Sequence, residues 1–122
     1  MSETLFHGRR ILVAEDEYVI AESMRRELEK AGASIVGPVA SVDAALSLIE
    51  TEQIDGALLD VCLRDQKIFP VAEALAARGI PFLSATGYDA ADLPEKWRTA
   101  PRCEKLVDLA TAAQTLANNL QK

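Results

Sequence analysis

Short apolar runs alternate along this chain with longer segments in which apolar residues recur every three or four positions. The short runs have the length and composition of buried strands, and they occupy residues 11–14, 34–38, 56–60, 80–85 and, with a weaker pattern, 102–104. Each run precedes a segment in which we expect a helix. The pattern predicts an α/β fold with a five-stranded, doubly wound parallel sheet, in which right-handed crossovers place helices on both faces.

The expected helices are marked by apolar faces and by residues that suit their ends. The faces comprise Ile20, Met24, Leu28 and Ala31 in the first helix, Ala45, Leu48 and Ile49 in the second, Val71 and Leu75 in the third, and Leu109, Ala113, Leu116 and Leu120 in the last. Ser41 and Asp108 suit N-cap positions, and Pro70 suits the first turn of a helix. Gly32 and Gly79 follow the last periodic residues of their segments and indicate helix ends.

Two stretches have a weaker pattern. Between residues 88 and 101, Pro94 interrupts the periodicity and apolar residues are few, so we expect a short or broken helix there. Residues 64–67 read Arg-Asp-Gln-Lys, which is typical of a solvated loop.

Composition narrows the class of protein. With 122 residues, 49% of them hydrophobic and 26% charged, the chain fits a single domain over residues 1–122 with a core from about 9 to 120 and no output domain. No segment has the length and apolarity of a signal peptide or a membrane span, so we expect a cytoplasmic protein without membrane contact. A net charge of −6 disfavours nucleic-acid binding, and the expected partners are proteins. Cys62 and Cys103 lack the spacing of a zinc or redox motif.

Acidic residues follow two of the expected strands. Glu15 and Asp16 come directly after the first strand, and Asp60 ends the third. Because parallel strands end at the same edge of a sheet, these carboxylates would meet if the two strands are neighbours. Carboxylates in contact repel one another unless a cation lies between them, and oxygen ligands suit Mg²⁺. The sequence therefore predicts a magnesium site at this edge.

Two further polar residues follow the remaining strands. Thr86 comes after the fourth strand and Lys105 after the fifth, so both are expected at the same edge as Asp60. Phosphoryl transfer requires such a set, because catalysis rests on positioning and on groups that offset the charge of the phosphoryl oxygens. Asp60 would attack phosphorus and form an acyl phosphate. Lys105 would supply a cation, and the hydroxyl of Thr86 a hydrogen-bond donor.

With these residues in place, the chain resembles the receiver domain of two-component response regulators along essentially its whole length. Residues 11–17 resemble the first strand of the family with its acidic pair, residues 56–60 the strand that presents the phosphoacceptor, and residues 85–88 the switch threonine with its neighbours. The last segment is similar to the Phe-Ala-Thr-Gly-x-Tyr signature of a subgroup of mostly stand-alone receivers in alphaproteobacteria.

The resemblance implies a flavodoxin-like, CheY-like fold with strand order 2-1-3-4-5. It also implies that Asp60 accepts a phosphoryl group from a sensor histidine kinase or a phosphotransfer protein, and that the domain signals to a downstream protein partner rather than acting as an enzyme. The backbone carbonyl of Cys62 would complete the Mg²⁺ ligands, and Thr86 and Tyr88 would serve as switch residues. A monomer or a weak homodimer is expected.

The chain departs from the family at two positions. Lys105 precedes Leu106 instead of the usual proline, so a trans peptide bond is expected there. Arg102 occupies the position of the usual aromatic switch residue, which excludes the usual aromatic flip. Tyr88 is the residue that we expect to take over part of that switching.

Three other functions match parts of the pattern. The first is a degenerate receiver that binds a partner without being phosphorylated. This hypothesis stays open because of the departures at Arg102 and Leu106. A haloacid-dehalogenase-like phosphatase also uses an aspartyl nucleophile after a strand, but it requires a second Asp where this chain has Cys62. A dinucleotide-binding domain is disfavoured, because no G-x-G-x-x-G motif follows the first strand.

Overall fold

The computed structural model describes residues 6, 8–60, 62–63, 66–86 and 102–104 of the chain. Along the sequence, the regular elements in these residues are β1 (Arg10–Ala14), α1 (Tyr18–Lys30), β2 (Ser34–Val39), α2 (Val42–Thr51), β3 (Gly56–Asp60), β4 (Cys62–Leu63), β5 (Gln66–Lys67), α3 (Phe69–Ala77), β6 (Phe82–Thr86) and β7 (Arg102–Glu104).

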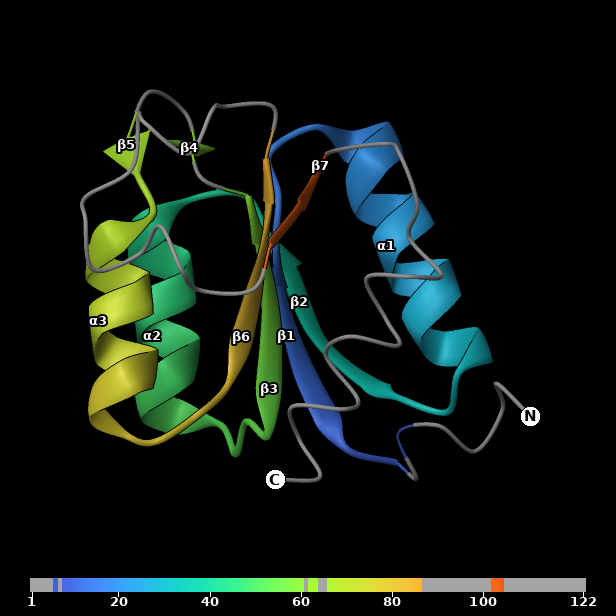
Figure 1. The fold of residues 1–122 in the computed structure, drawn as a ribbon, viewed down its shortest axis with the longest axis horizontal. Coiled ribbons are helices and arrows are strands. Elements are labelled where there is room, and N and C mark those ends of the chain that lie inside the picture. Colours follow the sequence, from blue (N-terminus) through green and yellow to red (C-terminus); the bar gives the residue numbers. More distant parts are fainter. Residues whose placement is uncertain (1–5, 7, 61, 64–65, 87–101, 105–122) are drawn as a thin grey trace.

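A sheet of five parallel strands forms the centre of the structure, with strands in the order β2-β1-β3-β6-β7. Counted as the five main strands along the sequence, this is the order 2-1-3-4-5, so the expected CheY-like sheet is confirmed. Helix α1 covers one face of the sheet, and α2 and α3 lie together on the other (Figure 1). The doubly wound arrangement predicted from the alternating pattern is therefore confirmed for the described residues.

The core has two halves, one on each face of the sheet. On one face, Val13 and Leu58 pack in a cluster with Met24 of α1. On the other face, Leu12 and Leu59 belong to a cluster that includes residues of α2 and α3. Because successive strand residues point to opposite faces and both faces are covered, β1 and β3 are apolar almost throughout. This explains why each strand appears in the sequence as a continuous apolar run.

The residues expected at helix ends are found there. The Oγ atom of Ser41 accepts a hydrogen bond of 3.1 Å from the backbone N–H of Ala44, so the predicted N-cap of α2 is confirmed. Pro70 lies in the first turn of α3, as predicted. Gly32 and Gly79 lie just beyond the ends of α1 and α3 and have φ angles of 92° and 69°. A side chain would strain the backbone at such angles, which accounts for glycine at both positions.

Two elements differ from those predicted from the sequence. The fourth main strand, predicted at residues 80–85, is observed as Phe82–Thr86, because Pro81 contributes only its carbonyl, which accepts a 3.1 Å hydrogen bond from the N–H of Ala57. Part of the predicted loop at residues 64–67 is a strand, since β5 pairs with β4 in a small antiparallel hairpin. Such short strands carry no detectable periodicity.

The helices expected at residues 88–101 and after residue 108 lie outside the described residues.

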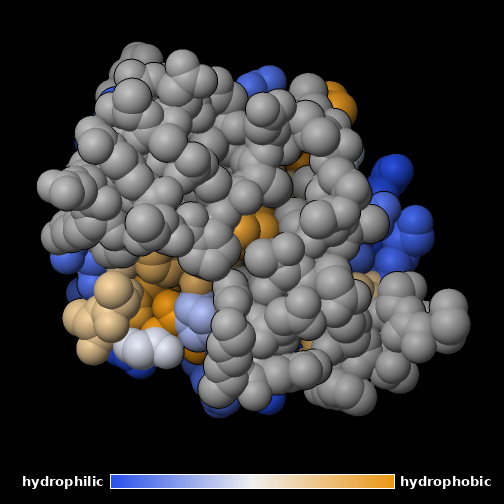
Figure 2. All heavy atoms as spheres, in the orientation of Figure 1, coloured by the Kyte–Doolittle hydropathy of each residue, from blue (hydrophilic) through white to orange (hydrophobic). Residues whose placement is uncertain are grey.

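Charged residues line the outer face of α1, where Figure 2 shows hydrophilic atoms along the edge of the molecule. The guanidinium of Arg25 donates hydrogen bonds of 2.7 Å to Glu22 and 2.6 Å to Glu29. The hydrogen bond with Arg25 lowers the pKa of Glu22, and the same bond raises the pKa of Arg25. Ion pairs at such exposed positions stabilise the fold only slightly. In the part of the chain that the structure describes, no helix has the length and apolarity needed to span a membrane.

Replacing Ser41 with alanine should lower the free energy of unfolding by about 1 kcal/mol, because the N–H of Ala44 loses its acceptor. The matched control is Ser47→Ala, at an exposed position inside the same helix, where alanine has the higher helix propensity and stability should stay the same or rise slightly. Urea denaturation followed by circular dichroism measures both changes. Equal effects of the two substitutions would contradict the capping role.

Candidate functional site

The register between β1 and β3 creates an acidic edge on the sheet. The two strands are parallel neighbours, and Ala14 pairs with Leu59. The next residues are Glu15, which follows β1, and Asp60, which ends β3, so the two lie side by side at the edge of the sheet. Asp16 follows Glu15 in the turn before α1. This arrangement follows from the sequence pattern, because apolar strands of similar length end at the same level.

The three acidic side chains lie close together. Glu15, Asp16 and Asp60 each offer a carboxylate oxygen, and these oxygens all lie within 4.8 Å of one another. Glu15 is only 2% exposed and Asp60 only 3%, whereas Asp16 is more accessible to solvent. Two of the three groups are thus largely removed from water, which would otherwise screen their charges.

Glu15 is held from two sides, once through its main chain and once through its carboxylate. Its N–H donates a 2.9 Å hydrogen bond to the carbonyl of Val39 at the end of β2. Its Oε2 atom accepts a 3.1 Å hydrogen bond from the N–H of Glu17, the N-cap residue of α1. The sequence carries no direct signal for Val39, because a backbone carbonyl can come from any residue type. The contribution of Glu17 is equally a main-chain one and leaves no trace in the residue pattern.

The chemistry of these donors fits a hard divalent cation. Carboxylates held this close repel one another, and a cation between them turns the repulsion into attraction. Mg²⁺ binds oxygen ligands at about 2.1 Å, so ligands on opposite sides of the ion are about 4.2 Å apart. Adjacent ligands of such an ion are about 3.0 Å apart, so oxygens within 4.8 Å of one another would have to draw closer together around it. Glu15, Asp16 and Asp60 can therefore hold Mg²⁺ as a set.

The backbone of β6 brings Thr86 to the same edge. Asp60 pairs with Ala85 in the parallel ladder between β3 and β6, and Thr86 is the next residue and the last of β6. On its other side, Thr86 pairs with Glu104 of β7. The strand order thus places the end of β6 beside the acidic edge. Tyr88, the other expected switch residue, lies outside the described residues.

Three other residues singled out in the sequence are Cys62, Arg102 and Lys105, which lie in or next to short strands. Cys62 begins β4, two positions after Asp60, and pairs with Lys67 of β5. Arg102 begins β7, where its main chain pairs with that of Ser84. Lys105 directly follows β7 and lies outside the described residues, so its proposed contact with a phosphoryl group stays a prediction.

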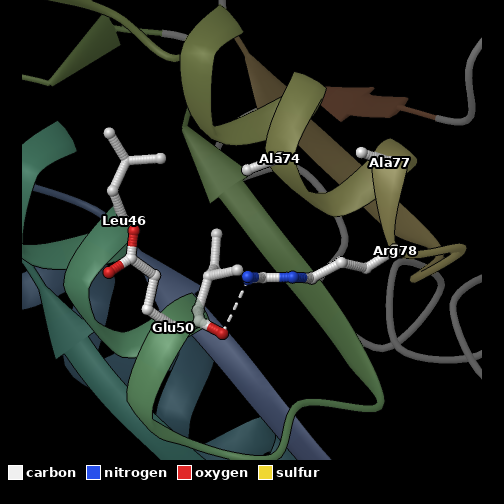
Figure 3. Close-up of a pocket in the computed structure, with 6 residues that line it drawn as sticks. Leu46, Glu50, Ala74, Ala77 and Arg78 are labelled. Atoms are coloured by element: carbon white, nitrogen blue, oxygen red, sulfur yellow. Dashed lines mark hydrogen bonds between the residues drawn. The ribbon is translucent and has the colours of Figure 1, made fainter.

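A shallow pocket of about 160 Å³ lies elsewhere, between α2 and α3 (Figure 3). It is lined by Leu46, Ile49, Glu50, Ala74, Ala77 and Arg78. The guanidinium of Arg78 donates a 2.8 Å hydrogen bond to the carbonyl of Ile49 and so ties the end of α3 to α2. The acidic cluster contributes no residue to this pocket, and the two features are separate.

Comparison with known structures identifies the fold. The solution structure of SdrG from Sphingomonas melonis Fr1 is 37% identical, covers 100% of both chains and has a TM-score of 0.81. The BeF3-activated conformation of SdrG from Pseudomonas melonis Fr1 is 40% identical over 91% of this chain and 95% of that one, with a TM-score of 0.75. A CheY-like response regulator receiver domain protein from Methanospirillum hungatei JF-1 shares the fold at 24% identity, with a TM-score of 0.82 over 93% of this chain and 94% of that one.

The chain is also similar in sequence to a curated regulatory protein. The transcriptional regulatory protein PdtaR from Mycobacterium tuberculosis is 31% identical over 100 residues, which is 81% of this chain and 49% of that protein. The chain thus spans about half the length of the curated relatives that it matches. No model of a protein family matches the chain. Given the fold and the likeness to SdrG over the full length, the chain belongs to the response regulator receiver domains, the CheY-like signalling domains of two-component systems.

Magnesium should stabilise the protein through the acidic cluster. At one hundred times its Kd, Mg²⁺ is expected to raise the free energy of unfolding by about 2.7 kcal/mol, because it binds only the folded state. Asp60→Asn should weaken this response to Mg²⁺, since it removes one carboxylate of the set. Thermal unfolding with Mg²⁺ or with a chelator measures both effects.

The control for charge is Asp43→Asn, which removes an exposed carboxylate from the first turn of α2. It changes the net charge by the same amount as Asp60→Asn but should leave the response to Mg²⁺ intact. If both variants respond to Mg²⁺ as the wild type does, the acidic cluster is not the metal site.

Proposed function

We propose that this chain is the phosphoacceptor of a two-component phosphorelay and that Asp60 receives the phosphoryl group from a phosphohistidine of a sensor histidine kinase or a phosphotransfer protein. The observation that carries the proposal is the cluster of Glu15, Asp16 and Asp60, with its oxygens within 4.8 Å of one another. In the reaction, an oxygen of Asp60 bonds to phosphorus as the bond from phosphorus to the histidine nitrogen breaks. The histidine nitrogen keeps the electron pair of the broken bond and takes up a proton from solvent, so the products are an acyl phosphate and a neutral histidine.

Glu15 and Asp16 are proposed to hold Mg²⁺ together with Asp60 and the backbone carbonyl of Cys62. When bound, Mg²⁺ offsets the charge of the phosphoryl oxygens and lowers their repulsion by the carboxylates. The protein contributes the positions of its oxygens in advance, because β1 and β3 are fixed by their register. Such pre-positioning is the main requirement of phosphoryl transfer.

Thr86 and Lys105 are proposed to bind the other phosphoryl oxygens. The pairing of Asp60 with Ala85 supports a role for Thr86, since it places the main chain of the next residue at the acidic edge. Movement of Thr86 toward the phosphoryl group, followed by Tyr88, would change the protein-binding surface and pass the signal to a downstream partner.

The surface at the start of α1 offers contact to a protein donor. Tyr18 is 78% exposed and Val19 is 75% exposed, and both directly follow the acidic turn. Large exposed side chains of this kind are stabilised when a protein surface covers them and removes them from water. The finer likeness, to stand-alone receivers with a Phe-Ala-Thr-Gly-x-Tyr signature, belongs to the same proposal. SdrG, with its BeF3-activated conformation, supports it as a similar protein that responds to a phosphoryl analogue.

A second function is favoured by one feature of the chain. Arg102 begins β7 at the position where receivers usually carry an aromatic switch residue, which suits a domain that binds a partner without phosphorylation. The acidic cluster favours the phosphoacceptor, because it gathers carboxylate oxygens at the edge where a cation and a phosphoryl group would meet.

One experiment separates the two functions. Incubation with acetyl phosphate and Mg²⁺ should yield a phosphorylated protein, detected by intact mass and by the lability of an acyl phosphate to base. Asp60→Asn and treatment with a chelator should each abolish the adduct, while Asp43→Asn should keep it. Full folding of the wild type together with no adduct would refute the phosphoacceptor and leave the binding module.

A further inference from the structure

Strand β2 contains an irregularity next to the acidic cluster. Leu12 of β1 pairs with Val36, but Ala14 pairs with Val39, so two residues of β2, Gly37 and Pro38, lie opposite the single residue between them on β1. Such a β-bulge adds one residue to a strand and redirects the chain beyond it. Gly37 has a φ angle of 101°, in the region that favours glycine.

The space at Gly37 is closed by main-chain atoms. A Cβ atom at this position would lie 2.9 Å from the nitrogen of Val39 and 3.0 Å from the carbonyl oxygen of Val13. Neither atom can be moved by rotating a side chain, so an added methyl group requires the main chain to shift, both within β2 at Val39 and between β2 and Val13 of β1. Gly37 itself is exposed, and the effect of a methyl group therefore comes from this close approach and not from overfilling the core.

The close approach has a direct consequence for the site. After the bulge, the carbonyl of Val39 accepts the 2.9 Å hydrogen bond from the N–H of Glu15. We propose that Gly37 is a positioning residue of the acidic cluster: by allowing β2 to approach β1, it places Val39 so that Glu15 is held where its carboxylate joins those of Asp16 and Asp60. The inference rests on the proposed function, in which these carboxylates hold Mg²⁺.

The test compares substitutions at two glycines that both have positive φ angles but different surroundings. Gly37→Ala adds a methyl group against main-chain atoms, whereas Gly79→Ala adds one at a φ of 69° with nothing within 4 Å. Gly37→Ala should raise the Kd for Mg²⁺ about tenfold or more, as the loss of a supporting contact around a metal site typically does. Gly79→Ala should leave that Kd unchanged even where it lowers the melting temperature.

A second measurement reports on the positioning itself. Amide hydrogen exchange followed by NMR should show the N–H of Glu15 protected in the wild type and in Gly79→Ala, and exchanging faster in Gly37→Ala, because its bond to Val39 is lost. A general loss of stability would speed exchange throughout the sheet. If Gly37→Ala is too unstable alone, sucrose can be added to all three proteins to favour the folded state.

The outcomes separate the inference from the proposed function. A wild type that binds Mg²⁺, together with a Gly37→Ala variant of equal Kd and equal protection at Glu15, overturns the positioning role and leaves the proposed function standing. An unprotected Glu15 amide in the wild type also overturns it. A wild type that binds no Mg²⁺ refutes the proposed function, and the exchange rates then still decide whether Gly37 positions Glu15.

Discussion

The site depends on the register between β1 and β3. At the amino ends of the strands, the N–H of Asp55 donates a 2.7 Å hydrogen bond to the carbonyl of Arg10, and the N–H of Arg10 donates a 2.9 Å bond to Oδ2 of Asp55. These reciprocal bonds fix the register from which Glu15 and Asp60 emerge side by side at the other end. A slip by one residue would turn every side chain of the strand to the opposite face of the sheet. Side chains that pack against α1 would then face α2 and α3, where they do not fit. The core therefore enforces the position of the carboxylates.

The packing that stabilises the fold also keeps the acidic residues Glu15 and Asp60 away from water. Leu12, Val13, Leu58 and Leu59 are at most 2% exposed, so the strands cannot bend apart to let water in beside Glu15 and Asp60. A cation held between the carboxylates would offset the repulsion between them. The apolar sheet thus holds the three carboxylates close to one another.

Much of this arrangement was predictable from the sequence, for a physical reason. Strands buried on both faces must be apolar, so an acid such as Asp60 at the end of such a run indicates both a strand end and a polar edge. The strand order came from resemblance to a family and not from the pattern. The hairpin of β4 and β5 and the bulge at Gly37 could not be predicted, because both rest on main-chain pairing over two or three residues, for which side-chain periodicity carries no information.

The bulge also explains an asymmetry around Asp60. On one side of the acidic cluster, Glu15 is fixed to β2 through Val39 and to α1 through Glu17. On the other side, β3 pairs with β6, whose last residue, Thr86, pairs with the short strand β7. A new charge on Asp60 would act on both sides. In the proposed function, a phosphoryl group on Asp60 would act on β6 through the pairing of Asp60 with Ala85, which lies beside Thr86.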